Sequence, residues 1–240
     1  AVSPAVPAAQ QNRWVEWDQF VAAHPHGGFM QSAAWIRCRA DDGYDHFALM
    51  LRDENLRLVG GAVVGRWQYG DDQAFYYIQD GPLLPDEPEL AAAVMNAVMA
   101  RIEQHRRDDP AVVSHLRIEP RRAEWPDFVA AGFQTPWLDD RFREPRHTNC
   151  VNLRTTEQER LRAMKPKGRY NVSLARRAGV TVVEDNTDHG LDDFVTVRND
   201  TAQRQNLNRH SREYFASMLN EFGSSAHLFF AELDSRRIAC

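Results

Sequence analysis

Basic residues gather in one segment of an otherwise acidic chain, and such a segment could bind an anion. Eight basic and two acidic residues lie between residues 154 and 177, whereas the 240-residue chain has a net charge of −5. Lys165, Lys167 and Arg169 stand at the start of a predicted helix over 166–178. Basic side chains beside the free amides of a helix N-terminus form an anion site. Such a site suits an anionic partner. A solvated basic helix face is the alternative.

The spacing within this helix predicts two faces. Positions four and seven apart lie on one side of a helix, and here they carry Lys165, Arg169 and Arg176. A second face is suited to packing against a neighbour and carries Tyr170, Leu174 and Ala178.

Signatures of several other chemistries are missing from the sequence. There is no GxxxxGK[ST], GxSxG, HExxH or GxGxxG motif. His24 and His26 form a lone pair without further ligands, and three scattered cysteines provide neither a disulfide framework nor a metal site. The negative net charge argues against a protein that coats nucleic acid over its whole surface. No apolar run approaches the length of a membrane-spanning helix, and the start of the chain does not resemble a secretory signal.

The elements that must position these residues begin with a mixed unit. Helices are predicted over 13–24, 31–39, 90–104 and 124–131, and strands over 46–52, 56–67, 74–79, 112–118, 133–138 and 148–153. Short turns join the first three strands, and a strand–helix–strand crossover follows. This order predicts a mixed sheet with helices on its faces.

A second unit repeats this opening. The capping box Thr156-x-x-Glu159 starts a helix over 157–164, Pro166 starts the next helix, and Gly179 ends it. The remaining segments are a strand at 180–184, helices at 191–204 and 212–222, and strands at 226–233 and 236–240. We therefore predict an α/β (α+β) fold of tandem mixed sheets flanked by helices. The domains are a flexible leader (1–12), a first unit (13–154) and an incomplete second unit (155–240). Because the chain ends within a strand, it is expected to be truncated.

Four spaced motifs resemble the Fem family of peptidoglycan aminoacyltransferases. In chain order they are Trp14…Phe20…Phe29-x-Gln31-x-x-x-Trp35-x-x-x-Arg39, Tyr77-x-x-x-Gly81-Pro82-Leu83-Leu84, Lys165-x-Lys167-x-Arg169-Tyr170-Asn171-Val172 with Ala175 and Gly179-Val180, and Phe194…Thr201-x-x-Arg204…Tyr214-Phe215. The resemblance covers residues 14–240. It implies two acetyltransferase-like (GNAT) halves, which agrees with the repeated element order.

The resemblance also implies roles for particular residues. Arg169 matches a substrate-contacting arginine of the family, and Arg39 stands where the family has a lysine that reaches the substrate phosphates. Tyr214 matches a substrate-facing tyrosine, and Asp86 substitutes, one position later, for an acidic residue after Gly81-Pro82. Substrate binding is therefore assigned to Arg39, Asp86, Lys165, Lys167, Arg169 and Tyr214. Each also has a structural reading, such as a dipole-compensating cation for Arg39, a loop carboxylate for Asp86 and a core side chain for Tyr214.

Two positions depart from the family pattern. Ser173 stands where members have a tyrosine, and Pro85 where many have the acidic residue. Gln31 and Trp35 are expected to be packing residues. No catalytic residue and no general base can be assigned.

The family resemblance implies a cytoplasmic enzyme that transfers an amino acid from aminoacyl-tRNA to a UDP- or lipid-linked muropeptide. It would use no cofactor and no metal, form no covalent enzyme intermediate, contact the inner face of the membrane peripherally and act as a monomer. An acyl-CoA-dependent GNAT N-acyltransferase and a non-catalytic binder of envelope glycan precursors remain open as alternatives, because fold does not determine the acyl donor.

Overall fold

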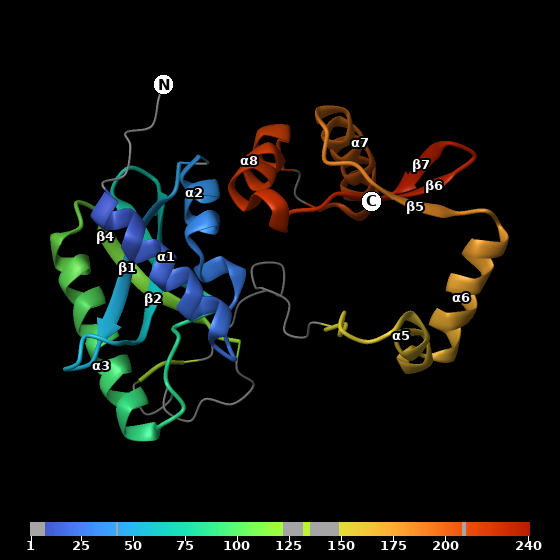
Figure 1. Cartoon of the computed structure of the whole chain (residues 1–240). Helices are drawn as coiled ribbons and strands as arrows, with labels where there is room; N and C mark the ends of the chain where they lie inside the picture. The colour runs from blue at the N-terminus through green and yellow to red at the C-terminus, as the bar shows by residue number, and fades with distance from the viewer. Residues whose placement is uncertain (1–7, 42, 122–131, 135–148, 208–209) are drawn as a thin grey trace. The chain divides into compact units, whose positions relative to one another are not determined.

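The chain folds into two compact units, Ala1–Trp137 and Leu138–Cys240, in a computed structural model that describes residues 8–41, 43–121, 132–134, 149–207 and 210–240. Figure 1 shows the elements in chain order. The helix expected over 124–131, most of the strand expected over 133–138 and the predicted boundary at 154/155 are not tested by the described residues.

The first unit has a four-stranded sheet in the order β1-β2-β3-β4. Its elements are α1 (Ala8–Ala23), η1 (Phe29–Gln31), α2 (Ala33–Asp41), β1 (Asp45–Arg52), β2 (Leu58–Tyr69), β3 (Gln73–Gln79), α3 (Pro88–Asp108) and β4 (Val112–Glu119). β1, β2 and β3 are antiparallel, and β3 runs parallel to β4 across the α3 crossover. This is the mixed sheet that the sequence predicted.

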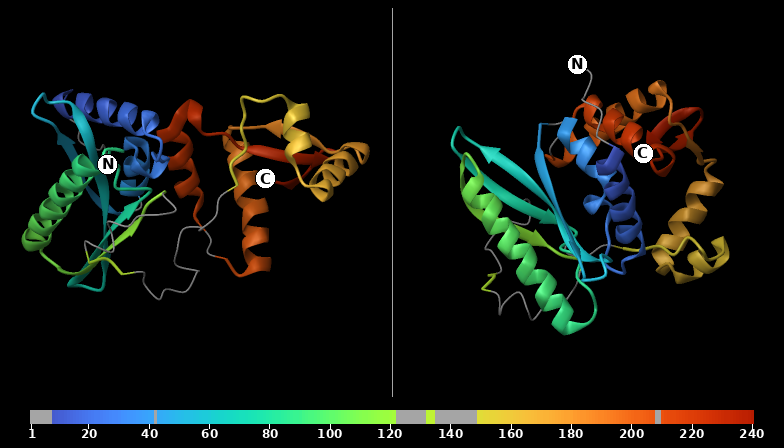
Figure 2. Two further views of the ribbon diagram at one scale, coloured as in Figure 1. Left: turned by 90° about the horizontal axis from the view of Figure 1, so that it is seen from below. Right: turned by 60° about the vertical axis from the view of Figure 1, so that its left-hand side comes forward.

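Helices cover both faces of this sheet, and each face has its own core cluster between sheet and helix (Figure 2). On the α3 face, Val94 and Val98 pack against Val64, Tyr76 and Ile78. On the other face, α1 contributes Trp17 and Val21, which pack against Val63 and Leu83. Successive side chains of a strand point to opposite faces of the sheet. Because both faces are buried, apolar side chains occur on both.

Two boundaries in the first unit differ from expectation. α1 begins at Ala8, so residues 8–12 of the predicted leader are helical, as suits a segment in which four of five residues are Ala or Gln, which are good helix formers. α2 begins only at Ala33, and Gln31 belongs to the preceding 3₁₀ turn, η1.

The second unit has a three-stranded antiparallel sheet in the order β5-β6-β7. Its elements are α5 (Glu157–Ala163), α6 (Pro166–Arg177), β5 (Thr181–Glu184), α7 (Asp188–Gln205), α8 (Arg212–Phe222), η3 (Gly223–Ser225), β6 (Phe229–Leu233) and β7 (Arg236–Ala239). The capping box at Thr156 is present, and Gly179 follows α6 with φ of 86°. Both predictions of helix ends are confirmed.

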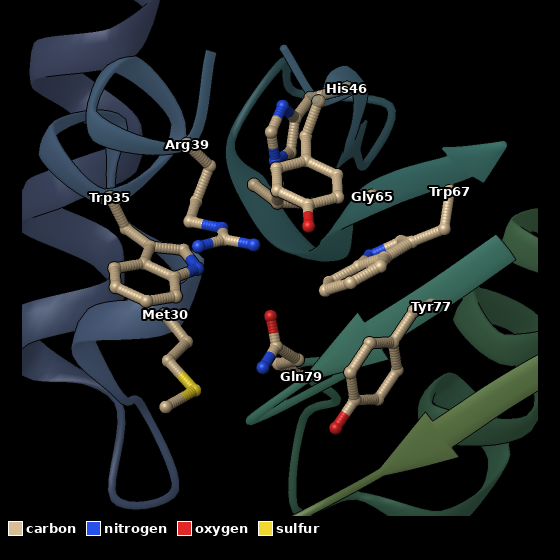
Figure 3. A pocket seen from close by; sticks show the side chains of 10 residues that line it. Met30, Trp35, Arg39, His46, Gly65, Trp67, Tyr77 and Gln79 are labelled. Atoms are coloured by element: carbon tan, nitrogen blue, oxygen red, sulfur yellow. The ribbon is translucent and has the colours of Figure 1, made fainter. Parts of the chain in front are cut away.

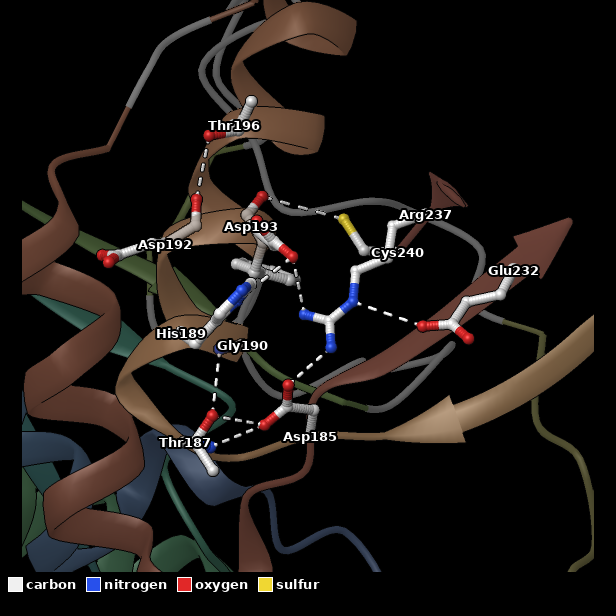
Figure 4. A network of polar contacts seen from close by, with 11 residues as sticks. Asp185, Thr187, His189, Gly190, Asp192, Asp193, Thr196, Glu232, Arg237 and Cys240 are labelled. Carbon is white, nitrogen blue, oxygen red and sulfur yellow. Dashed lines mark hydrogen bonds and ion pairs between the residues drawn. The ribbon is translucent and has the colours of Figure 1, made fainter. Parts of the chain in front are cut away.

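Buried apolar side chains and an ion-pair network hold this unit together. Phe230 and Leu191 lie in its core cluster. The Arg237 guanidinium lies 4.0 Å above the Phe230 ring and pairs with Asp185 at 2.5 Å and Asp193 at 3.0 Å (Figure 4). Asp185 also accepts a hydrogen bond from the Thr187 hydroxyl, and these bonds hold the pKa of its carboxyl below its ordinary value.

The strand expected at 148–153 is wrong for its described part. Residues 149–153 form no strand, and Val151 and Leu153 are exposed. The β-branched and apolar composition of this segment favoured a strand, but the described residues provide no ladder partner for it.

Candidate functional site

A buried arginine in the first unit is surrounded by aromatic rings. The Arg39 side chain, on α2, is only 9% exposed. Its Cζ atom lies 4.1 Å from the ring centroid of Tyr44, 5.4 Å from that of Trp67 and 5.6 Å from that of Trp35. Ring faces carry negative quadrupole charge and stabilise a cation at such distances. The aromatic rings therefore compensate in part for burial of the Arg39 charge.

The Arg39 guanidinium faces a small pocket on the α2 face of the sheet (Figure 3). The pocket has a volume of about 10 Å³, about the space of one water molecule. Its lining residues come from η1, α2, the following loop and strands β1 to β3, and are Met30, Trp35, Arg39, Tyr44, His46, Val63, Gly65, Trp67, Tyr77 and Gln79. A group larger than water would contact the Arg39 guanidinium only if this pocket were wider.

Arg39 is the main positive charge among the residues that line this pocket at neutral pH, because His46 is then uncharged. The pKa of His46 is lowered to about 4, mainly by burial and in smaller part by the nearby Arg39 charge, while a hydrogen bond with the Tyr44 backbone and the Asp45 charge oppose this shift. The imidazole is therefore neutral at pH 7. Neutral His46 provides hydrogen-bonding capacity beside a cation, which is chemistry suited to an anionic ligand.

At this pocket, the Gln31 side chain lies between strands β2 and β3 and takes up their backbone hydrogen bonds. Its fully buried side chain donates from Nε2 to the Val63 oxygen at 3.3 Å and to the Gln79 oxygen, and its Oε1 accepts from the Val63 amide at 2.7 Å. The last β2–β3 pair in this direction is Gly65 with Tyr77. Two residues farther on, the Gln31 amide bridges the two strands in place of a direct ladder bond. Gln31 is thus buried as expected, but its role is polar.

Asp86 lies apart from this pocket. It is exposed, it precedes Glu87, and it is not among the residues that line the pocket. The Glu87 carboxylate caps α3 by accepting from the amides of Glu89 at 3.1 Å and Leu90 at 2.6 Å. Asp86 therefore lies at the N-terminus of a helix, where a carboxylate is favourable in any case.

A second, open pocket of about 460 Å³ lies on the α3 face and is lined in part by Phe47, Arg66, Tyr76 and Asp109. Arg66 pairs with Asp109 through two hydrogen bonds, of 2.7 and 2.8 Å, and Tyr76 donates to the same carboxylate at 2.8 Å. These bonds hold the pKa of Asp109 well below its ordinary value. Because the Arg66 fork is already occupied, this pocket is poorly suited to an anion.

The predicted basic site lies in the second unit, around the junction of α5 and α6. Lys165 is the N-cap residue of α6, and Lys165 and Lys167 are both exposed. Arg169 points back to α5, where it donates to the backbone oxygens of Arg162, at 3.1 Å, and Met164. Neither described pocket is lined by these three basic residues. In this structure Arg169 satisfies carbonyl groups at the C-terminal end of α5, a structural role that the sequence did not indicate.

Tyr214 lies on α8 of the second unit and is partly buried. Its ring stacks on His210, with centroids 4.3 Å apart, and meets Phe215 edge-on at 5.2 Å. The structure thus places Lys165, Lys167, Arg169 and Tyr214 in one unit and Arg39 and Asp86 in the other. Within the first unit it brings Arg39, but not Asp86, into a pocket.

Sequence reasoning missed the aromatic residues that surround Arg39. Tyr44, Trp67 and Tyr77 were not assigned to the site. The signal for two of them was the alternation of aromatic residues, with Trp67 and Tyr69 at the end of β2 and Phe75 and Tyr77 in β3.

The described residues contain no group of three or more His, Cys, Asp or Glu side chains placed to hold a metal ion. Among the described helices, none combines the length and apolar character that crossing a membrane requires.

A family model described as the FemAB family matches residues 13–123 and 127–238. No curated protein sequence gives a significant match. Among solved structures, one described as the crystal structure of FemX has a TM-score of 0.75 and 21% identity, and covers 92% of this chain and 56% of that chain. The chain thus spans little more than half of the FemX chain. A probable acetyltransferase matches with a TM-score of 0.35 and 12% identity, over 60% of this chain and 92% of that chain.

Proposed function

Because the chain belongs to the FemAB family, whose model matches both of its halves, we propose that the protein is an aminoacyltransferase of peptidoglycan synthesis. Its donor would be aminoacyl-tRNA, and its acceptor the stem peptide of a UDP- or lipid-linked muropeptide. The observation that carries this proposal is the family match over two successive segments. The similarity in fold to FemX agrees with it.

Two features provide places for an anionic substrate. Arg39 directs a buried guanidinium at a pocket with aromatic walls. Lys165 and Lys167 add exposed positive charge at the N-terminus of α6. Guanidinium forks bind phosphates by paired, charge-assisted hydrogen bonds, so we assign a phosphate of the precursor to Arg39.

The proposed reaction requires few chemical groups from the protein. The ester of aminoacyl-tRNA is an activated acyl donor, and an amine of the acceptor peptide attacks its carbonyl carbon. The amide bond forms as the bond to the tRNA ribose oxygen breaks, the amine gives up a proton, and the ribose hydroxyl takes one up. The protein would orient the two substrates and stabilise the oxyanion. Such a route needs no covalent enzyme intermediate. It would take place in the cytoplasm, where charged tRNA is made.

The proposal is tested by calorimetric titration of the protein with a UDP-linked muropeptide and, separately, with CoA. We expect the muropeptide to bind and its affinity to fall as salt rises, because phosphate contacts carry it. Binding of CoA without binding of the muropeptide would contradict the proposal and favour a CoA-dependent N-acyltransferase.

A further inference from the structure

A histidine shares the Arg39 pocket. Both side chains line it, His46 from β1 and Arg39 from α2 (Figure 3). The pocket volume of about 10 Å³ admits a single oxygen atom, and a whole phosphate would fit only if the pocket were wider. An oxygen in this pocket would lie beside the guanidinium and the imidazole at once.

The hydrogen bonds of the His46 ring determine what it can offer to such an oxygen. A neutral imidazole has one N–H and one nitrogen that only accepts. The ring is hydrogen-bonded to the Tyr44 backbone, and this bond raises the pKa of His46, so the ring N–H is the donor in it. The second nitrogen is then an acceptor, which can donate to an anion only after it has taken up a proton.

The lining of the pocket favours an anion as the partner of these two side chains. Among the described residues that line it, none is Asp or Glu. Asp45, next to His46 in the chain, is exposed, and its carboxylate lies 3.6 Å from the Arg66 guanidinium. A bound anion would supply the negative charge that the lining lacks.

Charged and titratable groups face His46 from several elements. Arg39 lowers its pKa and Asp45 raises it. The whole set consists of Arg39 on α2, Tyr44 and Asp45 before and at the start of β1, Arg66 on β2, Tyr77 on β3, and His105, Asp108 and Asp109 at the end of α3. Arg66 and Asp109 neutralise each other, with 2.7 Å between them. Arg39 is therefore the charge beside the ring that an added anion would offset.

We propose that His46 is a second anion-binding residue beside Arg39, and that it takes up one proton from solvent as a phosphate of the precursor binds. The proton converts the accepting nitrogen into a donor, and the imidazolium gives a charge-assisted hydrogen bond to the oxygen that Arg39 contacts. The anion stabilises the added charge, which burial beside Arg39 disfavours in the free protein. The identity of the anion rests on the proposed function, whereas the uptake of a proton does not.

This uptake couples the affinity for the anion to pH. The pKa of His46 is about 4 in the free chain, and a bound anion raises it. Affinity therefore increases as the pH falls from 8 to 5, whereas Arg39 alone stays fully charged over this range. We expect the Kd for a UDP-linked muropeptide to fall by about five- to tenfold between these two pH values.

Nuclear magnetic resonance of the histidine rings tests the charge of His46 directly. The chain carries isotope-labelled histidine, and the variant His46→Gln assigns the signal. The solutions contain chloride alone, sulfate at the same ionic strength, or a UDP-linked muropeptide. Sulfate keeps its charge throughout this pH range, so it probes the pocket independently of the proposed substrate. We expect the His46 ring to be neutral at pH 5 in chloride and largely cationic with either anion, with a titration midpoint about one to two pH units higher.

Variants separate this role from a structural one. In His46→Gln the Kd for the muropeptide should be close to that of the unmodified chain at pH 8 and should no longer fall towards pH 5. Arg39→Ala should remove the effect of both anions on the His46 ring. His189→Gln, which replaces a histidine whose side chain is 79% exposed, is the matched control and should retain the pH dependence. Circular dichroism establishes that each variant is folded.

The proposal is overturned if the muropeptide binds while the His46 ring stays neutral at pH 5, or if His46→Gln retains the pH dependence of the Kd. A change at His46 with the muropeptide alone upholds it. A change with sulfate alone also upholds it, while absence of muropeptide binding would contradict the proposed function. If neither anion binds, both are contradicted, so the two can fail separately or together.

Discussion

The Arg39 guanidinium lies over the ring of Tyr44, with 4.1 Å between Cζ and the ring centroid. Arg39 belongs to the last turn of α2, and Tyr44 to the connection that leads into β1. The chain thus turns back on the helix end and encloses a cation that would otherwise point to solvent. This contact converts a helix-terminal arginine into the charged wall of a pocket.

Replacing Arg39 should weaken binding of the phosphorylated precursor. We expect Arg39→Ala to raise the Kd for a UDP-linked muropeptide by about 10- to 150-fold, the equivalent of a charge-assisted hydrogen bond. Arg39→Lys, which keeps the charge but not the planar fork, should have a smaller effect. Isothermal calorimetry measures both. Arg57→Ala, at an exposed position elsewhere in the unit, is the matched control. An unchanged Kd for Arg39→Ala would remove Arg39 from the site.

Replacing Arg169 should loosen the α5–α6 junction as well as reduce precursor binding. Without its guanidinium, backbone oxygens of Arg162 and Met164 lose a donor. We expect Arg169→Ala to increase amide hydrogen exchange in α5 and the first turn of α6 by several-fold to about tenfold. Hydrogen-exchange mass spectrometry measures this, with Arg162→Ala as control. If exchange stays unchanged while binding is lost, Arg169 acts on the ligand alone.

Removing the Gln31 amide should destabilise the first unit. Gln31→Ala leaves peptide groups of Val63 and Gln79 without their partners in a buried place. We expect a loss of at least about 3 kcal/mol in the free energy of unfolding. All six tryptophans lie between residues 14 and 137, so tryptophan fluorescence in a urea titration follows this unit. The exposed Gln68→Ala is the control. A loss below about 1 kcal/mol would mean that water replaces the amide.

The neutral state of His46 should make the first unit less stable in acid. Its pKa is lowered to about 4 in the folded chain, mainly by burial, against about 6.5 when unfolded. The unfolded chain therefore binds the proton first. The stability contribution is complete above about pH 6.5 and is lost as pH falls towards 4, by at most about 3 kcal/mol.

Urea unfolding at a series of pH values, followed by tryptophan fluorescence, checks the His46 prediction. In His46→Gln, which has no titratable ring, stability should decline less between pH 6.5 and 4 than in the unmodified chain. Parallel pH curves for the two proteins would show that His46 titrates normally.

Local rules predicted most elements of the fold from sequence. Apolar periodicity placed α3, and turn residues separated β1, β2 and β3, because these signals act between near neighbours. The Thr156 capping box and Gly179 identified helix ends for the same reason. The strand prediction for 148–153 was wrong for the described residues 149–153. A strand also requires a partner, and local composition does not show which distant segments pair.

The candidate site was only partly accessible from sequence. Family motifs identified Arg39, but the rings of Tyr44 and Trp67 reach it only through the return of the chain and the pairing of β1 with β2. Likewise, helical spacing grouped Arg169 with Lys165, whereas α5 engages Arg169 and leaves Lys165 exposed. Spacing predicts which residues share a face, but not which neighbour that face contacts.

The transfer reaction itself provides the most direct test of the proposed function. The protein is incubated with tRNA charged with a labelled amino acid and with a UDP-linked muropeptide, and the muropeptide is analysed by mass spectrometry. We predict a gain in mass of one amino-acid residue on the stem peptide, abolished by prior treatment of the tRNA with RNase and not supported by acyl-CoA. A gain that survives RNase, or that requires an acyl-CoA donor, would contradict the account.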